Sequence, residues 1–210
     1  MLHQFRTVVS QLVESAMMVV GVRVGTEEPG YTVQPLIDGV EIRRYGPRIA
    51  AETTVTATEE AARNAGFRRL ADYIFGGNHQ HRRIAMTPPV AVGRRTGQRI
   101  AMTAPVAQTS RGEEGWLIRF HMPAEWTMDT LPAPDDERIR LVRLPAESVA
   151  VLRFSGDRGP GAVAKRTEQL LETLRATGFA PVGEPTTWLY DPPWTIPFRR
   201  RNEVAVAVDA

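Results

Sequence analysis

The order of predicted secondary-structure elements constrains the fold of this 210-residue sequence more than any other feature. Residues 40–45 alternate between apolar and polar side chains, and a Gly-Pro turn follows them. Residues 48–57 are rich in β-branched side chains and predict a second strand. A helix is expected from Thr58, a suitable N-cap, to about Phe75, where two glycines follow. The first half therefore has the order strand, turn, strand, helix.

The second half repeats this order at an offset of about one hundred residues. Residues 138–144 alternate, a Pro-Ala turn follows, and residues 148–154 predict another strand. A helix is expected over residues 162–176 and would end at Gly178. Two similar halves, each with strands and one long helix, predict a domain of the α+β class.

A seven-residue phrase occurs twice between these halves. Ile-Ala-Met-Thr-Pro-Pro-Val occupies residues 84–90, and Ile-Ala-Met-Thr-Ala-Pro-Val occupies residues 100–106. The turn-rich sequence between them predicts a hairpin with its tip at 94–97, which would place Met86 and Met102 each opposite a proline of the other phrase. Because proline has no N–H to donate, the ladder would be interrupted there. Methionine can line a pocket for a flat ligand, but it more often fills gaps in a core.

Residues 1–25 are expected to form an amphipathic helix and a linker outside the domain predicted for residues 31–210. Polar residues such as Arg6 and Glu14 interrupt the apolar positions, so this helix is too polar to span a bilayer. It also lacks the unbroken apolar run of a signal peptide, and we expect a cytoplasmic protein. The helix could dock on the domain or on a partner, including a second copy in a homodimer. A membrane-surface helix is the less favoured alternative.

Charge and cysteine content exclude several classes of function. The sequence has 26 basic and 24 acidic residues, and this small excess does not predict a nucleic-acid partner. Because there is no cysteine, disulfides, thiolate catalysis and zinc–thiolate sites are excluded. No serine nucleophile with a base and no phosphate-binding loop can be recognised. We therefore favour a protein that is not an enzyme.

Four parts of the sequence, taken in order, resemble the SOUL haem-binding protein family. Each is a weak signal alone, but together they cover residues 31–209 and are specific. The matching segments are Val-Glu-Ile-Arg-Arg-Tyr at 40–45, Gly-Phe-Arg-Arg-Leu-Ala-Asp-Tyr-Ile at 66–74, the second phrase at 100–106, and a C-terminal signature formed by Tyr-Asp-Pro-Pro-Trp at 190–194 and Arg-Arg-Asn-Glu-Val at 200–204.

This resemblance implies a distorted β-barrel built from two βαββ-like halves. It also implies noncovalent binding of haem or another tetrapyrrole beside the first helix, by a carrier, buffer or sensor. Two alternatives stay open. A bound haem can supply oxygen chemistry, so the protein could be a haem-degrading oxygenase. The same architecture also occurs in effector-binding domains for other small aromatic ligands, because a fold does not define its ligand.

The first helix is the predicted wall of the tetrapyrrole site. A porphyrin needs a wide apolar surface, and its two propionates need cations such as arginine. Each apolar residue of the helix, taken singly, is better explained as core packing against the sheet, whereas the set remains a candidate pocket wall. The expected cofactor-binding residues are Phe67, Leu70, Ala71 and Ile74, with Arg63, Arg68 or Arg69 at the margins and Met86 and Met102 nearby.

A His-x-His sequence follows the first helix and could ligate the haem iron. His79 and His81 come after two glycines, and a solvated loop is the simpler interpretation of such a segment. If the protein ligates iron directly, we expect His79 or His81 to do so. Met86, Met102 and His121 rank below them.

Overall fold

The computed structural model describes residues 26–79, 97–192 and 194–209, which form two compact units. Of the described residues, unit 1 contains 26, 30–45 and 147–209, and unit 2 contains 27–29 and 46–146. Apart from the short segment 27–29, the chain passes from one unit to the other at the two turns predicted from the sequence, the Gly-Pro turn and the Pro-Ala turn.

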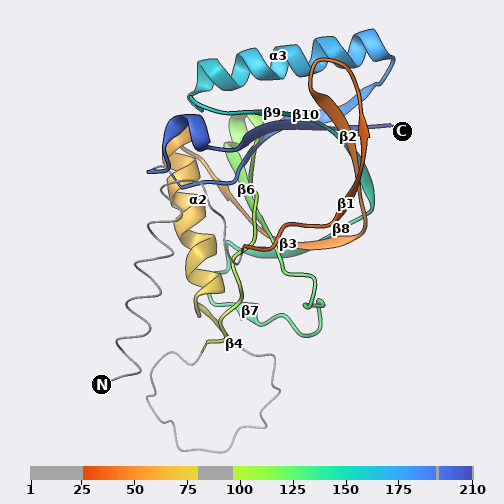
Figure 1. The fold of residues 1–210 in the computed structure, drawn as a ribbon. Coiled ribbons are helices and arrows are strands. Elements are labelled where there is room, and N and C mark those ends of the chain that lie inside the picture. The colour runs from red at the N-terminus through yellow and green to blue at the C-terminus, as the bar shows by residue number, and fades with distance from the viewer. Residues whose placement is uncertain (1–25, 80–96, 193, 210) are drawn as a thin grey trace, which may run out of the picture. The chain divides into compact units, whose positions relative to one another are not determined.

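Unit 1 is an antiparallel sheet of five strands with one long helix, α3, along one face (Figure 1). The strand order is β1, β2, β9, β11, β10. Helix α3 ends at Gly178, as predicted, and the φ of 79° at this residue is a left-handed conformation that glycine adopts without strain. The elements are β1 (Tyr31–Pro35), β2 (Val40–Tyr45), β9 (Glu147–Phe154), α3 (Pro160–Thr177), β10 (Pro181–Leu189), the 3₁₀ turn η2 (Pro197–Arg199) and β11 (Asn202–Val208).

The core of unit 1 lies between α3 and the sheet. Ile42 of β2 pairs with Ala150 of β9, and both belong to a buried apolar cluster with Leu170 and Leu174 of α3. Successive residues of a strand point to opposite faces, so the neighbouring Arg43 projects from the face that α3 does not cover.

Unit 2 has four antiparallel strands in the order β5, β6, β3, β8, together with helix α2 and a small two-stranded pairing of β4 with β7. Helix α2 begins directly after Thr58, as predicted, although the Thr58 side chain makes no capping hydrogen bond. The elements are β3 (Arg48–Val55), α2 (Glu59–Ile74), β4 (Asn78–His79), β5 (Val106–Ser110), the 3₁₀ turn η1 (Gly112–Glu114), β6 (Trp116–His121), β7 (Ala133–Pro134) and β8 (Arg140–Leu144).

Helix α2 packs closely on strand β6. Leu70 and Tyr73 of the helix are buried in one cluster with Ile118 and Phe120 of the strand. Gly66 lies where helix and strand are closest, because a Cβ atom at this position would come within 2.8 Å of the Ile118 Cβ. A residue with any side chain would therefore force the helix away from the sheet.

The structure confirms the α+β class and the two long helices, and it shows that the named strands pair antiparallel. The strands on either side of each predicted turn do not pair with each other. Instead, β2 pairs with β9 and β8 pairs with β3, so the first strand of each predicted half pairs with the second strand of the other half. Closure of the strands into a barrel and the similarity of the two halves in space stay predictions.

Only the second of the two repeated phrases falls within the described residues. Over residues 97–105 the structure has one strand-like pairing, an isolated parallel bridge between Glu27 and Thr103. The expected hairpin partners around Met86 lie outside the described residues, as does the predicted N-terminal helix. Within the described ranges, no helix is long and apolar enough to cross a bilayer.

Candidate functional site

Helix α2 carries a stripe of apolar side chains on its outer surface. Phe67, Ala71 and Phe75 follow one another at intervals of one helical turn, and we call these three residues the α2 stripe. Phe67 and Phe75 are 38% and 53% exposed. The Phe67 ring also meets the ring of buried Phe120 edge-on, with centroids 5.4 Å apart, so its orientation is set by the core. The stripe is thus an exposed apolar surface on a rigid support.

Two predicted cofactor-binding residues of α2 are not part of this surface. Leu70 and Ile74 are 0% and 1% exposed and belong to the core under the helix, as the core interpretation of individual residues predicted. Leu70 is turned away from Phe67 by about 60° around the helix axis. Ile74 is turned by only about 20°, and it is buried in one cluster with Ile100, whose N–H donates to the Ile74 carbonyl at 2.8 Å.

Arginine side chains border the α2 stripe. Arg63 lies one turn before Phe67 and forms a long ion pair with Glu59, with 4.0 Å between Nη1 and Oε1. Arg68 is exposed, and its Nε donates a hydrogen bond to the carbonyl of Asn64 at 3.2 Å. Arg99 places its guanidinium 5.9 Å from the centroid of the Phe75 ring. Two of these cations belong to α2, and Arg99 belongs to the segment 97–105.

Arg69, the third arginine suggested for the margin, points inward instead. Its Nη1 donates to the Thr53 hydroxyl at 2.5 Å, and its Nε lies 3.5 Å from a carboxylate oxygen of Asp136. The pKa of Arg69 is lowered, because burial and the charge of Arg138 outweigh the opposite effect of Asp136. Arg69 therefore ties α2 to β3 and to the segment before β8.

His79 lies just beyond the C-terminal end of α2, in strand β4, and is exposed. Its Nδ1 is 2.7 Å from an oxygen of Asp135, which is also exposed. An ionised carboxylate can only accept a hydrogen bond, so Nδ1 of His79 carries the hydrogen of this contact. A carboxylate bound to the second ring nitrogen is the usual arrangement of histidines that ligate metals.

The remaining predicted site residues divide into three groups. Met102 is half-buried and packs against the core cluster of unit 2, which is the gap-filling role. His121 is buried in β6. Met86 and His81 lie outside the described residues. Among the described residues, no three acidic or histidine side chains cluster closely enough to hold a metal ion.

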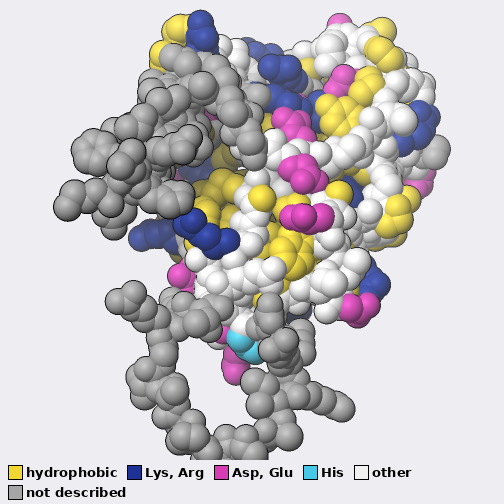
Figure 2. All heavy atoms as spheres, turned by 60° about the horizontal axis from the view of Figure 1, so that its bottom comes forward, with side chains coloured by type: hydrophobic (Ala, Val, Ile, Leu, Met, Phe, Trp, Pro, Cys, Tyr) yellow, Lys and Arg dark blue, Asp and Glu magenta, His cyan; other side chains and the backbone are white. Residues whose placement is uncertain are grey.

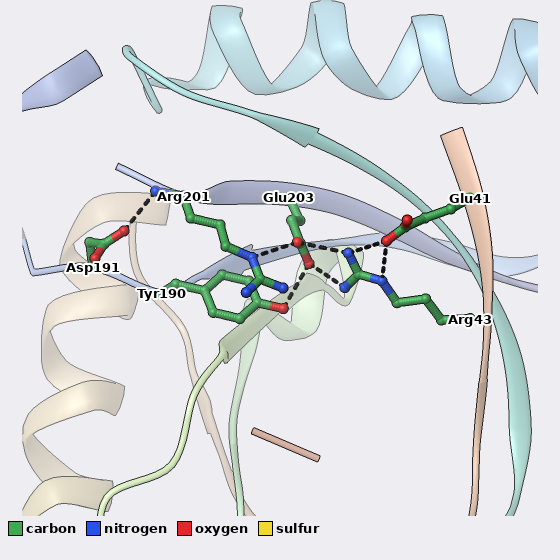
Figure 3. Close-up of polar contacts among 6 residues, drawn as sticks. All are labelled: Glu41, Arg43, Tyr190, Asp191, Arg201 and Glu203. Carbon is green, nitrogen blue, oxygen red and sulfur yellow. Dashed lines mark hydrogen bonds and ion pairs between the residues drawn. The ribbon is translucent and has the colours of Figure 1, made fainter. Parts of the chain in front are cut away.

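A buried charged network in unit 1 was not among the predicted sites (Figure 3). Glu203 is fully buried in β11, and three side chains donate hydrogen bonds to its carboxylate. Arg43 donates from Nη1 and Nη2 at 2.7 and 2.9 Å, Arg201 donates from Nε at 2.8 Å, and the Tyr190 hydroxyl donates at 2.7 Å. Glu41 in turn accepts a hydrogen bond from the Nε of Arg43 at 2.6 Å.

Electrostatics keep this network charged although it is buried. Burial alone would raise the pKa of Glu203, but the hydrogen bonds and charges of Arg43 and Arg201 lower it below its usual value. Burial would likewise lower the pKa of Arg43, and Glu203 more than reverses this effect. The network has no net charge, because it contains two carboxylates, Glu41 and Glu203, and two guanidinium groups, Arg43 and Arg201. Glu203 already accepts hydrogen bonds from three side chains, so we assign the network a structural role and not the binding of a cationic ligand.

The sequence contained one signal for this network. Arg43 stands in the 40–45 segment, and Tyr190, Arg201 and Glu203 stand in the C-terminal segments, which are the parts of the sequence that resemble a known family. Arg43 and Glu203 lie in strands beside buried apolar residues, and charged residues in such positions are unusual unless they are paired.

A family model described as SOUL heme-binding protein matches residues 26–207. The chain belongs to the SOUL heme-binding family. The match covers most of the chain and includes strands from both units, helix α2 and the residues of the Glu203 network. A search of curated proteins finds no match.

Solved structures share the fold of this SOUL-family chain at low sequence identity. The C-terminal domain of EcmrR matches with a TM-score of 0.56 at 10% identity, over 85% of this chain and 98% of that one. EcmrR in a complex with DNA matches with a TM-score of 0.55 at 10% identity, over 99% and 64%. A hydrolase from Listeria innocua matches with a TM-score of 0.52 at 9% identity, over 83% and 94%. At such identities these likenesses concern the fold alone.

Proposed function

We propose that this protein binds haem or a related tetrapyrrole noncovalently at the α2 stripe, as a cytoplasmic carrier, buffer or sensor. Membership in the SOUL family supports the class of ligand. The observation that carries the proposal is the exposed apolar stripe of Phe67, Ala71 and Phe75, bordered by arginines.

The chemistry of the stripe fits a tetrapyrrole. An aromatic ring can stack on, or meet edge-on, a flat macrocycle, and Ala71 leaves room between the two phenylalanines. Arg63, Arg68 and Arg99 could each pair with a propionate, because a guanidinium matches a carboxylate in shape and charge. On the face drawn in Figure 2, hydrophobic side chains lie in separate patches among acidic and basic ones. A ligand with an apolar centre and charged edges would suit the α2 stripe, because arginines border its aromatic side chains.

His79 is the described residue that best fits an iron ligand. Asp135 would orient its ring through the hydrogen bond at Nδ1. When haem is bound, the iron supplies redox and oxygen chemistry. The chain itself would supply the apolar contact, the cations for the propionates and the orientation of the His79 ring.

Titration with ferric haem and with iron-free protoporphyrin IX tests this proposal. Phe75→Asp places a charge in the stripe and should weaken the binding of both ligands at least tenfold. Phe198→Asp is the matched control, because Phe198 is an exposed aromatic residue of unit 1 and its change should leave the affinity unaltered. Equal affinities of the two variants, with both proteins folded, would reject the α2 stripe as the site.

The two ligands also separate surface binding from iron ligation. His79→Ala should leave protoporphyrin binding intact and shift the Soret band of the haem complex. A complex that is stable under reductant and oxygen supports a carrier, whereas loss of the Soret band with formation of a linear tetrapyrrole, in the presence of catalase, supports an oxygenase. Saturable binding of aromatic dyes without binding of either tetrapyrrole would support an effector-binding domain instead.

A further inference from the structure

The segment 97–100 lies against the C-terminal end of α2. At its start, Gly97 packs directly on Gly76, because a Cβ atom at Gly97 would overlap the Gly76 carbonyl oxygen. At its end, the backbone N–H of Ile100 donates to the carbonyl of Ile74 at 2.8 Å, and the Ile100 side chain is buried. The backbone of this segment is therefore held at both ends.

The side chain of Asn78 holds the backbone between these two ends. Asn78 is buried, and its Nδ2 donates to the carbonyl of Gln98 at 2.8 Å while its Oδ1 accepts from the Gln98 N–H at 2.9 Å. The carboxamide therefore pairs with Gln98 through a donor and an acceptor, as a neighbouring strand would. Nδ2 also donates to the carbonyl of Tyr73 in the last turn of α2 at 2.6 Å. Asn78 thus joins the segment to the helix.

Arg99 stands directly between these anchors, and its side chain is exposed. Its guanidinium lies 5.9 Å from the centroid of the Phe75 ring, at one end of the α2 stripe. This distance is within the range of a cation–π interaction, which holds a cation near a ring and leaves its charge in place. None of the described carboxylates forms an ion pair with Arg99. The stripe therefore has a positioned cation beside an exposed aromatic ring.

The two helix arginines at the margin of the stripe are held differently. The Nη1 of Arg63 faces Glu59 at 4.0 Å, so part of its charge is already offset. Arg68 is exposed, and its hydrogen bond goes to the carbonyl of Asn64, one turn earlier in the same helix. A long side chain that orders only on a ligand loses rotamer entropy, whereas a group positioned beforehand loses less. Arg99 differs from both, because its guanidinium already lies at a ring of the stripe.

We propose that Arg99 selects tetrapyrroles with a free propionate, and that Asn78 is the residue that positions it. This inference rests on the proposed function, since it assigns the propionate contact of the same α2 stripe. A macrocycle on Phe75 would bring one propionate to the guanidinium of Arg99, which can donate two parallel hydrogen bonds to a carboxylate. Without the Asn78 carboxamide, Gln98 would lose its pairing and Arg99 would no longer be held at the ring.

Fluorescence titration of the full chain with iron-free protoporphyrin IX and with its dimethyl ester tests the selection. The two probes share the macrocycle and differ in the charge of the propionates, and neither contains iron that His79 could ligate. Arg99→Gln should weaken protoporphyrin binding about fivefold and leave ester binding unchanged. Arg143→Gln is the matched control, because Arg143 is an exposed arginine of β8 and its change should alter neither affinity. If Arg68→Gln lowers protoporphyrin binding and Arg99→Gln does not, Arg99 is not the selecting residue.

The role of Asn78 is tested by its dependence on Arg99. Asn78→Ala should weaken protoporphyrin binding in the wild type and should cause no further loss in the Arg99→Gln variant. A purely structural role would lower the affinity for the ester as well, and would do so equally in both backgrounds. If Asn78→Ala does not fold, Asn78→Ser replaces it, because serine keeps a hydrogen-bond donor at this position.

The outcomes separate this inference from the proposed function. If Arg99→Gln binds protoporphyrin as tightly as the wild type does, while Phe75→Asp still weakens binding, the assignment of Arg99 is wrong and the α2 stripe remains the site. Additive losses from Asn78→Ala and Arg99→Gln would show that Asn78 does not act through Arg99. If neither probe binds to the wild type, the proposed function and this inference are both wrong.

Discussion

Arg43 of β2 donates two hydrogen bonds to the carboxylate of Glu203 on β11, although strand β9 lies between these two strands in the sheet. Both side chains are nearly inaccessible to solvent. A buried ion pair of this kind adds little net stability compared with an apolar pair, but removal of one partner leaves a buried charge without compensation. The pair therefore joins β2, near the start of the family match, to β11 at its end, and loss of either side chain should be costly.

We expect Arg43→Met to lower the free energy of unfolding by about 3–5 kcal/mol, because Glu203 would keep its charge and lose two of its hydrogen bonds. Arg44→Met is the control on the same strand, since Arg44 is exposed and should change stability by no more than about 0.5 kcal/mol. Urea denaturation measures both. The double change Arg43→Met with Glu203→Leu should recover part of the loss, and equal stabilities of the two single variants would contradict the role of the pair.

Gly66→Ala should destabilise the protein by about 1–3 kcal/mol, because the added methyl group would overlap Ile118. Gly161→Ala is the matched control in α3, where a Cβ atom would meet no neighbouring atom. That change should be neutral or stabilising by up to about 1 kcal/mol. Thermal unfolding compares the two variants, and a Gly66→Ala protein as stable as the Gly161→Ala protein would show that α2 does not pack as closely as described.

The stability contributed by His121 should depend on pH. Its pKa is lowered to about 3 in the folded state, so below its ordinary value of about 6.5 the unfolded state binds the proton first. The free energy of unfolding of the wild type should then fall relative to His121→Asn as the pH decreases from about 6.5 towards 3, by at most about 1.4 kcal/mol per pH unit. Denaturation in carboxylate-free buffers measures this difference, which should be constant above pH 7. A constant difference down to pH 4 would contradict the burial of a neutral ring.

Variants of Leu70 and Phe67 should distinguish a loss of stability from a loss of tetrapyrrole binding. Leu70→Ala removes a fully buried side chain and should cost about 2–5 kcal/mol of stability. Phe67→Ala removes a partly exposed ring, so it should cost less stability and should weaken tetrapyrrole binding more. Denaturation and Soret titration of the same two variants provide the comparison. If Leu70→Ala, measured well below its unfolding temperature, weakens binding more than Phe67→Ala, the ligand does not rest on the α2 stripe.

The alternation of apolar and polar residues, and the residues that begin and end helices, predicted β2, β3, β8, β9 and both long helices to within two or three residues. These elements could be predicted because they depend on side chains that are neighbours along the chain. The prediction that α2 presents apolar and arginine side chains also came from residues that are close together in the sequence. It could not assign each residue to the inner or outer face, and the structure places Leu70 in the core and Phe67 at the surface.

The sequence by itself thus determined the class of the fold, the strands β2, β3, β8 and β9, both long helices and the family to which the chain belongs. Only the tertiary structure decided which strands pair across the chain, and with them the contact between Arg43 and Glu203, 160 residues apart, and the burial of His121 among arginines. Such pairings form because distant segments bury their side chains together, and the free energy of this burial depends on the whole sheet. No single stretch of residues therefore carries a periodic pattern that predicts them.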